Sequence, residues 1–108
     1  GDYRMSEEVE KKDIAVIGDS DFTLGFELAG VQKTFGTENY REKISELIDR
    51  EDLGIIVAKE EDIQELPKRV QNNVDSSVDP VVVSLSETAE SERLQEKIKK
   101  AIGADITG

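Results

Sequence analysis

The sequence predicts an α/β fold: a small open parallel four-stranded sheet, built from a strand and a helix repeated four times, in a Rossmann-like or receiver-like topology with a C-terminal helix. Apolar runs of strand length alternate with stretches of helical periodicity, which is typical of α/β proteins. The first run, Asp13–Ile17, is apolar at nearly every position, as in a strand covered on both faces. No hairpin signal joins two strands, so right-handed crossovers are expected to make all of them parallel.

A glycine-bounded turn and a short helix follow the first strand. Gly18 permits a sharp exit from that strand. The next helix can be capped by one of three polar residues: Asp19, Ser20 or Asp21. We expect this helix over Phe22 to Ala29, apolar enough to be largely buried, and Gly30 to end it in the left-handed conformation.

A weak strand and an amphipathic helix come next. Val31–Phe35 has three polar residues between its apolar ends, which favours a place at the sheet edge. We expect Thr37 to cap a helix over Glu38 to Arg50, in which Glu46 and Arg50 pair four residues apart. The spacing places these apolar side chains on one helical face: Tyr40, Ile44, Leu47 and Ile48.

The third strand is another short apolar run, Gly54–Ala58. The following stretch, Glu60 to Val74, is predicted to be helical but interrupted, because Pro67 disfavours helical geometry in the residue before it. Asn72 to Asp79 is polar and is predicted to be a loop.

The last strand and helix complete the predicted fold. Pro80–Leu85 is predicted to be a strand with its proline at the first position, where proline is tolerated. A helix over Glu90 to Ile102 is expected, ended by Gly103. Its apolar stripe contains Leu94, Ile98, Ala101 and Ile102.

Composition limits the functions that this chain can have. Its 108 residues carry a net charge of −11, which disfavours binding to nucleic acid and to an anionic membrane, and instead favours a protein partner with a basic patch. The sequence contains neither Cys nor His, which excludes thiol chemistry, typical zinc sites and Ser-His nucleophiles. No apolar run has the ~18 residues of a membrane-spanning helix, so we expect a soluble, cytoplasmic chain without direct membrane insertion.

Length and composition predict one domain with an appendage at each end. Residues 1–12 are polar and are expected to be a disordered leader or in part a cloning remnant, since Met5 can be the native initiator. Residues 13–86 form the predicted α/β core. Residues 87–108 form a predicted hinge and C-terminal helical segment, because a serine-rich stretch precedes the last helix.

The acidic turn after the first strand stands where α/β proteins often place a ligand. Its carboxylates repel phosphate, and its glycines match neither the G-x-G-x-x-G nor the P-loop pattern. Asp19 and Asp21 can hold Mg²⁺ as in a response-regulator receiver domain, or they can cap the helix; we favour capping. Receiver chemistry also needs an Asp at the end of strand three and a Lys after a later strand, and the sequence has Ala58-Lys59 and Ser86-Glu87 there. The acids at 60–62 are expected to form a solvated first helical turn.

Two segments remain as candidates for partner contact. Gly25-Phe26-Glu27-Leu28-Ala29-Gly30 combines small residues with apolar ones, so another backbone can approach it closely, or it can pack tightly on its own sheet. The stripe of the last helix can cover the sheet or dock in a partner's groove. The sequence predicts no catalytic residue, no cofactor site and no metal site.

Four segments together resemble the F subunit family of A-type/V-type ATP synthases. They are the first strand with its G-D-x-D and G-F-x-L-A-G motifs (Ile14–Gly30), the G-I-I strand followed by acids (Gly54–Glu61), the proline-led strand Pro80–Leu85, and the helix Leu94–Ile106, which ends in K-x-A-I-G-x-D-I. The segments occur in the family's order and cover nearly all of residues 13–106. The charged N-terminal extension and the weak second strand depart from the pattern.

The resemblance implies a non-catalytic central-stalk (rotor) subunit that couples ATP turnover to ion translocation. It implies two partners, the coiled-coil D subunit of the stalk and the A3B3 catalytic head, and a place on the inner face of the cell membrane through the complex. We expect the partner interface to include Asp19, Asp21, Gly25, Phe26, Leu28, Ala29, Gly30, Leu94, Ile98, Ala101 and Ile102. The alternative is a receiver-like or phosphotransfer signalling domain.

Overall fold

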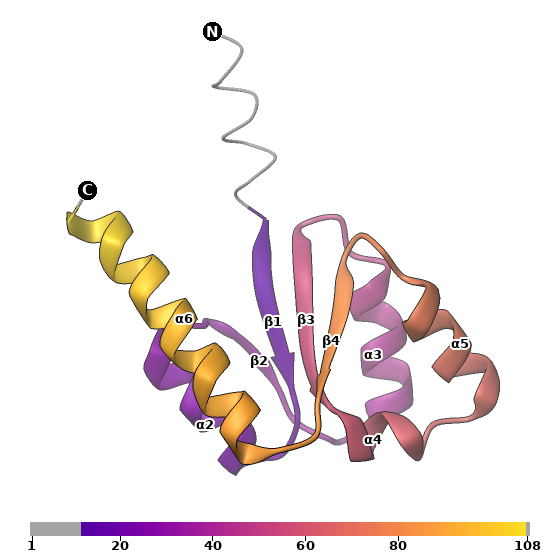
Figure 1. Ribbon diagram of the computed structural model, residues 1–108. Coiled ribbons are helices and arrows are strands. Elements are labelled where there is room, and N and C mark those ends of the chain that lie inside the picture. Colours follow the sequence, from indigo (N-terminus) through magenta and orange to yellow (C-terminus); the bar gives the residue numbers. More distant parts are fainter. Residues whose placement is uncertain (1–11, 108) are drawn as a thin grey trace, which may run out of the picture.

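The computed structural model describes residues 12–107, with side chains over residues 12–101. Strands and helices alternate almost throughout, as predicted (Figure 1). The strands are β1 (Asp13–Ile17), β2 (Lys33–Phe35), β3 (Leu53–Lys59) and β4 (Val81–Leu85). The helices are α2 (Ser20–Ala29), α3 (Tyr40–Ile48), α4 (Glu60–Gln64), α5 (Lys68–Ser76) and α6 (Thr88–Thr107).

The four strands form one sheet in the order β2-β1-β3-β4, and every neighbouring pair is parallel. The predicted fold class is therefore confirmed. The second strand is three residues long and lies at an edge, as its weak pattern indicated. Its outward-directed polar residues are tolerated because only one neighbour pairs with it.

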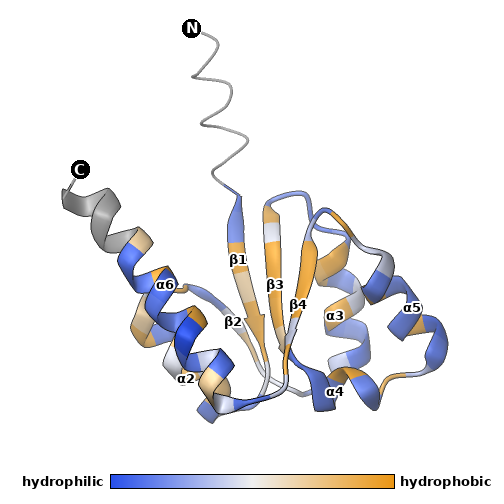
Figure 2. Cartoon of the chain, in the orientation of Figure 1, coloured by the Kyte–Doolittle hydropathy of each residue, from blue (hydrophilic) through white to orange (hydrophobic). Residues whose placement is uncertain are grey.

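Helices cover the two faces of the sheet unequally. Figure 1 shows α3, α4 and α5 on one side and α2 and α6 on the other. Because side chains alternate along a strand, Ala15 and Ile56 belong to the core under α3 and α5, whereas Val16 and Val57 belong to the core under α2 and α6. Figure 2 shows β1, β3 and β4 as the most hydrophobic part of the chain, with hydrophilic residues along the outer helix surfaces. This pattern follows from a sheet that is buried between two helical layers.

Two predictions about the helices α2 and α3 were wrong, and one is confirmed. The helix α2 is not largely buried: Thr23, Phe26 and Ala29 are its buried residues, because only one of its faces meets the sheet. The helix α3 begins at Tyr40, and the residue before it is Asn39, whose φ of 53° is left-handed, so Thr37 does not cap it. The predicted face of α3 is confirmed, since Ile44 and Leu47 are buried and Tyr40 and Ile48 pack beside them.

Three further corrections concern helix ends. Arg50 lies beyond the end of α3 and pairs with Asp52 at 2.6 Å, so it does not pair with Glu46 as predicted. The predicted break at Pro67 is confirmed, but α5 runs on to Ser76 where a loop was expected, because Val74 is buried against the core. The helix α6 continues to Thr107, so Gly103 does not end it as predicted. A glycine in a helix interior costs about 1 kcal/mol relative to alanine and is tolerated.

The appendages are described only in part. Of the predicted leader, residues 1–11 lie outside the described residues, whereas the Lys12 ammonium group pairs with the Asp79 carboxylate at 2.9 Å. The division into a core of residues 13–86 and a hinged segment of residues 87–108 stays a prediction.

Candidate functional site

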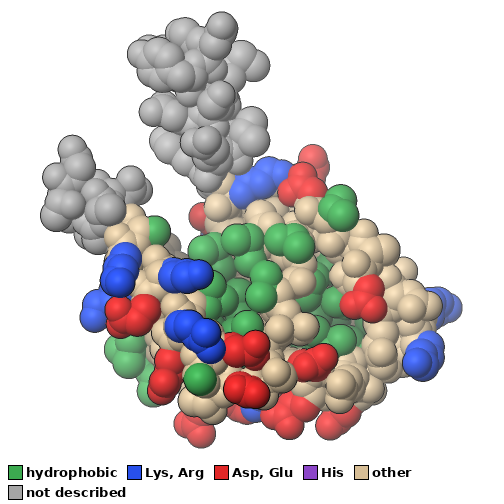
Figure 3. All heavy atoms as spheres, viewed as in Figure 1, with side chains coloured by type: hydrophobic (Ala, Val, Ile, Leu, Met, Phe, Trp, Pro, Cys, Tyr) green, Lys and Arg blue, Asp and Glu red, His purple; other side chains and the backbone are tan. Residues whose placement is uncertain are grey.

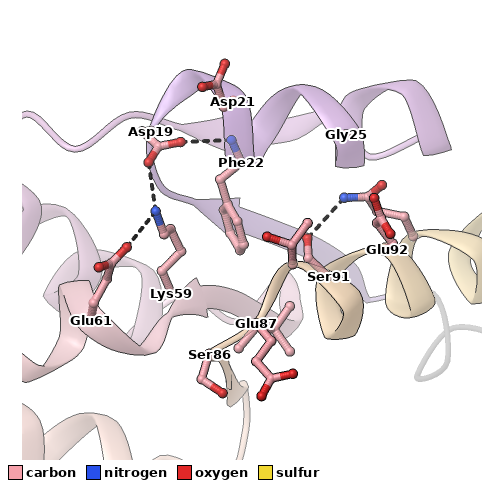
Figure 4. Close-up of a pocket in the computed structure, with 13 residues that line it drawn as sticks. Asp19, Asp21, Phe22, Gly25, Lys59, Glu61, Ser86, Glu87, Ser91 and Glu92 are labelled. Atoms are coloured by element: carbon pink, nitrogen blue, oxygen red, sulfur yellow. Dashed lines mark hydrogen bonds and ion pairs between the residues drawn. The ribbon is translucent and has the colours of Figure 1, made fainter.

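A cleft of about 490 Å³ opens at the carboxyl ends of the strands, the edge at which open α/β sheets usually bind ligands (Figure 4). It lies between the acidic turn after β1, the end of β3 and the start of α6. Its charged lining consists of Asp19, Asp21, Lys59, Glu61, Glu87 and Glu92. The candidate site is therefore acidic, with one cation inside it.

Asp19 performs the capping role that the sequence predicted. Its Oδ1 accepts a hydrogen bond from the backbone N–H of Phe22 at 2.9 Å, at the start of α2. Its Oδ2 lies 2.9 Å from the Lys59 ammonium nitrogen. The hydrogen bond from Lys59 and that from Phe22 both hold the pKa of Asp19 below its ordinary value. The carboxylate is thus committed to two donors within the chain.

Lys59 was missed in the sequence analysis and is the central group of the cleft. Its ammonium nitrogen also lies 2.8 Å from Glu61 Oε1, so it bridges two carboxylates (Figure 4). The hydrogen bonds to Glu61 and Asp19 raise the pKa of Lys59. The signal available in the sequence was its position directly after the third strand, which places it at the same edge as the turn after the first strand.

This arrangement differs from the Mg²⁺ site of a receiver domain. Asp21 belongs to the first turn of α2 and points away from the Lys59 ammonium group in Figure 4. Among the residues that the structure describes, no three potential metal ligands come together. Lys59 occupies the end of β3, where receiver chemistry requires a phosphate-accepting Asp, and its charge already compensates Asp19. The geometry gives the receiver alternative no support.

Two serine hydroxyls of the cleft, those of Ser86 and Ser91, make hydrogen bonds at the start of α6. Ser86 donates to Glu90 Oε1 at 3.1 Å, but the same oxygen accepts the backbone N–H groups of Ser86 and Glu87 at 2.9 and 3.2 Å. These backbone hydrogen bonds lower the pKa of Glu90, which makes its carboxylate a weak base. The Ser91 hydroxyl accepts from the Gln95 amide at 3.1 Å. The arrangement begins a helix and positions no nucleophile.

The small residues of α2 permit a close approach between two helices. A side chain at Gly25 would meet the Gln95 amide of α6, with Cδ only 2.8 Å from the added carbon. Phe26 is fully buried, and Ala29 and Ile98 are each 7% exposed in the core beneath these helices. Gly30 ends α2 with a φ of 117°, as predicted. The tight packing at Gly25 is therefore made within this chain, against α6.

The predicted interface residues differ in their burial. Asp19, Asp21 and Leu28 face solvent, with Leu28 78% exposed, whereas Phe26, Ala29 and Ile98 lie inside. Leu94 is half-buried against the same core, Ala101 is exposed, and the Ile102 side chain lies outside the described residues. The buried residues can shape a surface but cannot contact a partner while α6 is packed as here. The role of all eleven in partner contact stays a prediction.

Exposed apolar side chains were also missed. Leu24 is 51% exposed and stands one turn before Leu28 on α2. Ile55 and Val81 are 36% and 42% exposed on neighbouring strands. Leu28 was among the expected interface residues, whereas Leu24 was missed. The spacing of four between Leu24 and Leu28, in a short helix that buries a different face, could have indicated Leu24. The sequence carried no signal for Ile55 and Val81, because apolar residues are expected in any buried strand.

Comparisons with known proteins agree with one another. A family model described as "ATP synthase (F/14-kDa) subunit" matches residues 14–102. The F subunit of the A-type ATP synthase of Methanothrix thermoacetophila is 41% identical over 97 residues, which cover 87% of this chain and 97% of that protein. The same protein of Methanocorpusculum labreanum is 37% identical with the same coverage. The crystal structure of the V-type ATP synthase F subunit from Archaeoglobus fulgidus superposes with a TM-score of 0.64 at 32% identity, covering 70% of this chain and 99% of that one.

Proposed function

The chain belongs to the ATP synthase F subunit family, and from that premise we propose that it is a non-catalytic component of the central stalk of an A-type/V-type ATP synthase. In this role it couples ATP synthesis or hydrolysis in the A3B3 head to ion translocation through the membrane sector. Its partners are the coiled-coil D subunit of the stalk and the A3B3 head. Through this complex it lies on the cytoplasmic side of the cell membrane.

The observation that carries the non-catalytic role is the state of the cleft. At the edge where an enzyme of this fold would keep free acids, bases or a phosphate cradle, Lys59 is paired with Asp19 and Glu61. The serine hydroxyls beside them serve the start of α6. The central charged and hydroxyl groups of the cleft thus have structural partners, which supports a protein that acts through binding.

The surface properties also support a binding role. Components of permanent complexes keep apolar side chains at their contact surfaces, and Leu24 and Leu28 are exposed together on α2. Among the described residues, no helix is both long and apolar enough to cross a bilayer. Contact with the membrane sector then runs through other components of the complex.

Reconstitution with the D subunit from the same genome tests the proposal. Mixed at micromolar concentration, the two proteins should elute from size-exclusion chromatography as one complex of defined stoichiometry, measured by light scattering. The absence of a complex at this concentration would contradict the stalk role, because an interface of ~1,200–2,000 Å² normally binds more tightly.

Incubation with acetyl phosphate and Mg²⁺ tests the receiver alternative. We expect no mass increase, because the Lys59 ammonium group pairs with the acid of the turn. A stable acyl phosphate on any Asp, detected by intact-protein mass spectrometry, would contradict the non-catalytic role. A receiver domain of known activity serves as the positive control.

A further inference from the structure

One face of the sheet is only partly covered by the helices that the structure describes. On the side of α2 and α6, these helices pack over Val16 and Val57 in the middle of the sheet. The helix α6 slants away from β4 along its length (Figure 1). Ile55 of β3 and Val81 of β4 are register partners on this face and stay exposed. Parallel sheets are almost always covered on both faces, so an open apolar face on this fold calls for a covering element.

The uncovered part of the sheet forms one wall of an apolar groove of about 650 Å³, and α6 forms the other. Figure 3 shows the hydrophobic side chains gathered between α6 and the strands. The apolar lining consists of Ile14, Val31, Ile55, Val57, Val83, Leu94, Ile98 and Ala101. Leu94, Ile98 and Ala101 are three of the predicted interface residues, so the groove joins them to a sheet surface that the sequence did not indicate.

Charge at the groove is opposite to that of the whole chain. The chain carries a net charge of −11, yet the groove is lined by Lys12, Lys33 and Lys97 against Asp13. Lys33 pairs with Asp13 at 2.7 Å, and Lys12 pairs with Asp79. Lys97 is exposed and makes no ion pair within the described part of the chain. The rim therefore offers positive charge to an occupant, unlike the acidic cleft at the opposite ends of the strands.

We infer that this groove binds an amphipathic helix of a partner protein, whose apolar face is flanked by Asp or Glu. The apolar face covers Ile55, Val81 and Val83, and a flanking acid meets Lys97, the groove lysine that makes no ion pair within the described part of the chain. Such a helix lies beside α6. Together with α2 and α6 it gives this face of the sheet three covering helices, as α3, α4 and α5 do on the opposite face. The inference rests on the proposed function, which requires a helical stalk partner, and adds the surface and the chemistry of that contact.

The groove favours a partner helix over other occupants. A small molecule would need convergent polar groups to orient it, and the polar lining here lies on the rim. Two copies of the chain joined groove to groove would offer Lys97 no acidic partner, because Asp13, the acid in the groove lining, already pairs with Lys33. The apolar lining of the groove fits the apolar face of an amphipathic helix, and Lys97 fits an acid beside that face.

Two groove variants and one matched control test the inference with the full chain. Lys97→Glu reverses the rim charge on an exposed position, and Ile55→Asp places a charge on the groove floor. Lys68→Glu makes the same charge change on α5, on the opposite face of the sheet. The D subunit of the same genome is the probe, and the dissociation constant is measured by isothermal titration calorimetry at low and high salt.

We expect Lys97→Glu to weaken binding about fivefold to tenfold and to reduce its salt dependence, and Ile55→Asp to weaken it at least about tenfold. Lys68→Glu should stay within about twofold of the wild-type chain. Because Lys97 is exposed, Lys97→Glu should keep the fold. It therefore tests the groove assignment even if Ile55→Asp lowers the stability of the chain.

The other results separate the two proposals. Wild-type binding to the D subunit with no loss in Lys97→Glu would overturn the groove assignment and leave the stalk role intact. No binding by the wild-type chain would overturn the stalk role and the groove assignment together. A dimer of this chain that Ile55→Asp abolishes, seen by sedimentation velocity, would show that a second copy covers the groove and would overturn the assignment of a partner helix.

Discussion

Replacing Gly25 with alanine measures whether α6 packs on α2 in solution as it does in the structure. Gly25 lies within α2, and a methyl group there would meet the side-chain amide of Gln95, with Cδ and Oε1 both 2.8 Å away. The amide is the end of a flexible side chain and can move. When it moves, its hydrogen bond to the Ser91 hydroxyl, now 3.1 Å long, is lost.

Two opposing terms set the expected change in the free energy of unfolding. Alanine in a helix interior is favoured over glycine by about 0.8–1.0 kcal/mol. Loss of the Gln95–Ser91 hydrogen bond costs about 0.5–1.5 kcal/mol. Gly25→Ala should therefore change stability by close to zero. In a Gln95→Ala background the amide is absent, so the same substitution should stabilise by about 1 kcal/mol.

Urea unfolding of the wild-type chain, both single variants and the double variant gives the coupling free energy directly. We expect a coupling of about 1 kcal/mol between Gly25→Ala and Gln95→Ala. If Gly25→Ala stabilises the chain equally in both backgrounds, the two helices are not in contact at this point in solution, and the packing argument fails. The Gln95→Ala background is the matched control, because it changes the neighbour and leaves α2 unaltered.

Charge and packing lead to three other expectations. Asp62 Oδ2 and the Tyr40 hydroxyl are both buried without a hydrogen-bond partner in the described chain. Burial raises the pKa of Asp62, so its ionisation makes the stability of the chain fall as the pH rises past 3.8, and Asp62→Asn should raise the melting temperature at pH 7. Tyr40→Phe removes the buried hydroxyl and should stabilise the chain by up to about 1 kcal/mol. The lowered pKa of Asp19 means that its pairing with Lys59 stabilises the chain above pH 3.8 and that this stabilisation is lost in stronger acid. Lys59→Met should therefore be less stable than the wild-type chain at neutral pH, and the difference should shrink as the pH falls below 3.8. A difference in melting temperature that stays constant with pH in thermal scans would contradict this. Truncation after Glu87 removes α6 but leaves the core under α3 and α5, so a cooperative transition at a lower temperature is expected by circular dichroism, and its loss would show that α6 is integral to the core.

Local sequence signals predicted most of the fold. Uninterrupted apolar runs predicted the strands β1, β3 and β4, because strands buried on both faces need apolar residues at nearly every position. Gly30 and Asp19 marked the ends of α2, since a left-handed turn and an N-cap depend on a few neighbouring residues. Helix ends with weak local signals were placed wrongly: the burial of Val74 extends α5, and the left-handed Asn39 delays the start of α3.

The candidate site was predictable only in part. The capping role of Asp19 followed from its position after a strand, whereas Asp21, which was also expected to cap, lies in the first turn of α2. The pairing of Asp19 with Lys59, forty residues away, could not be predicted, because it depends on the order in which parallel strands lie side by side. The meeting of Gly25 with Gln95 likewise depends on how two helices cross.

The amino-acid sequence alone establishes an acidic chain without Cys or His, an alternation of predicted strands and helices, and motifs that resemble one family. These properties depend on the identity of each residue and on its close neighbours in the sequence. Tertiary packing decided that Asp19 of the turn is neutralised from within the chain. It also decided that Phe26 and Ile98 lie in the core, while Ile55 lines an open groove and its register partner Val81 stays exposed. Burial is a property of the whole arrangement: the same apolar residue is core under a helix and surface where the covering layer stops.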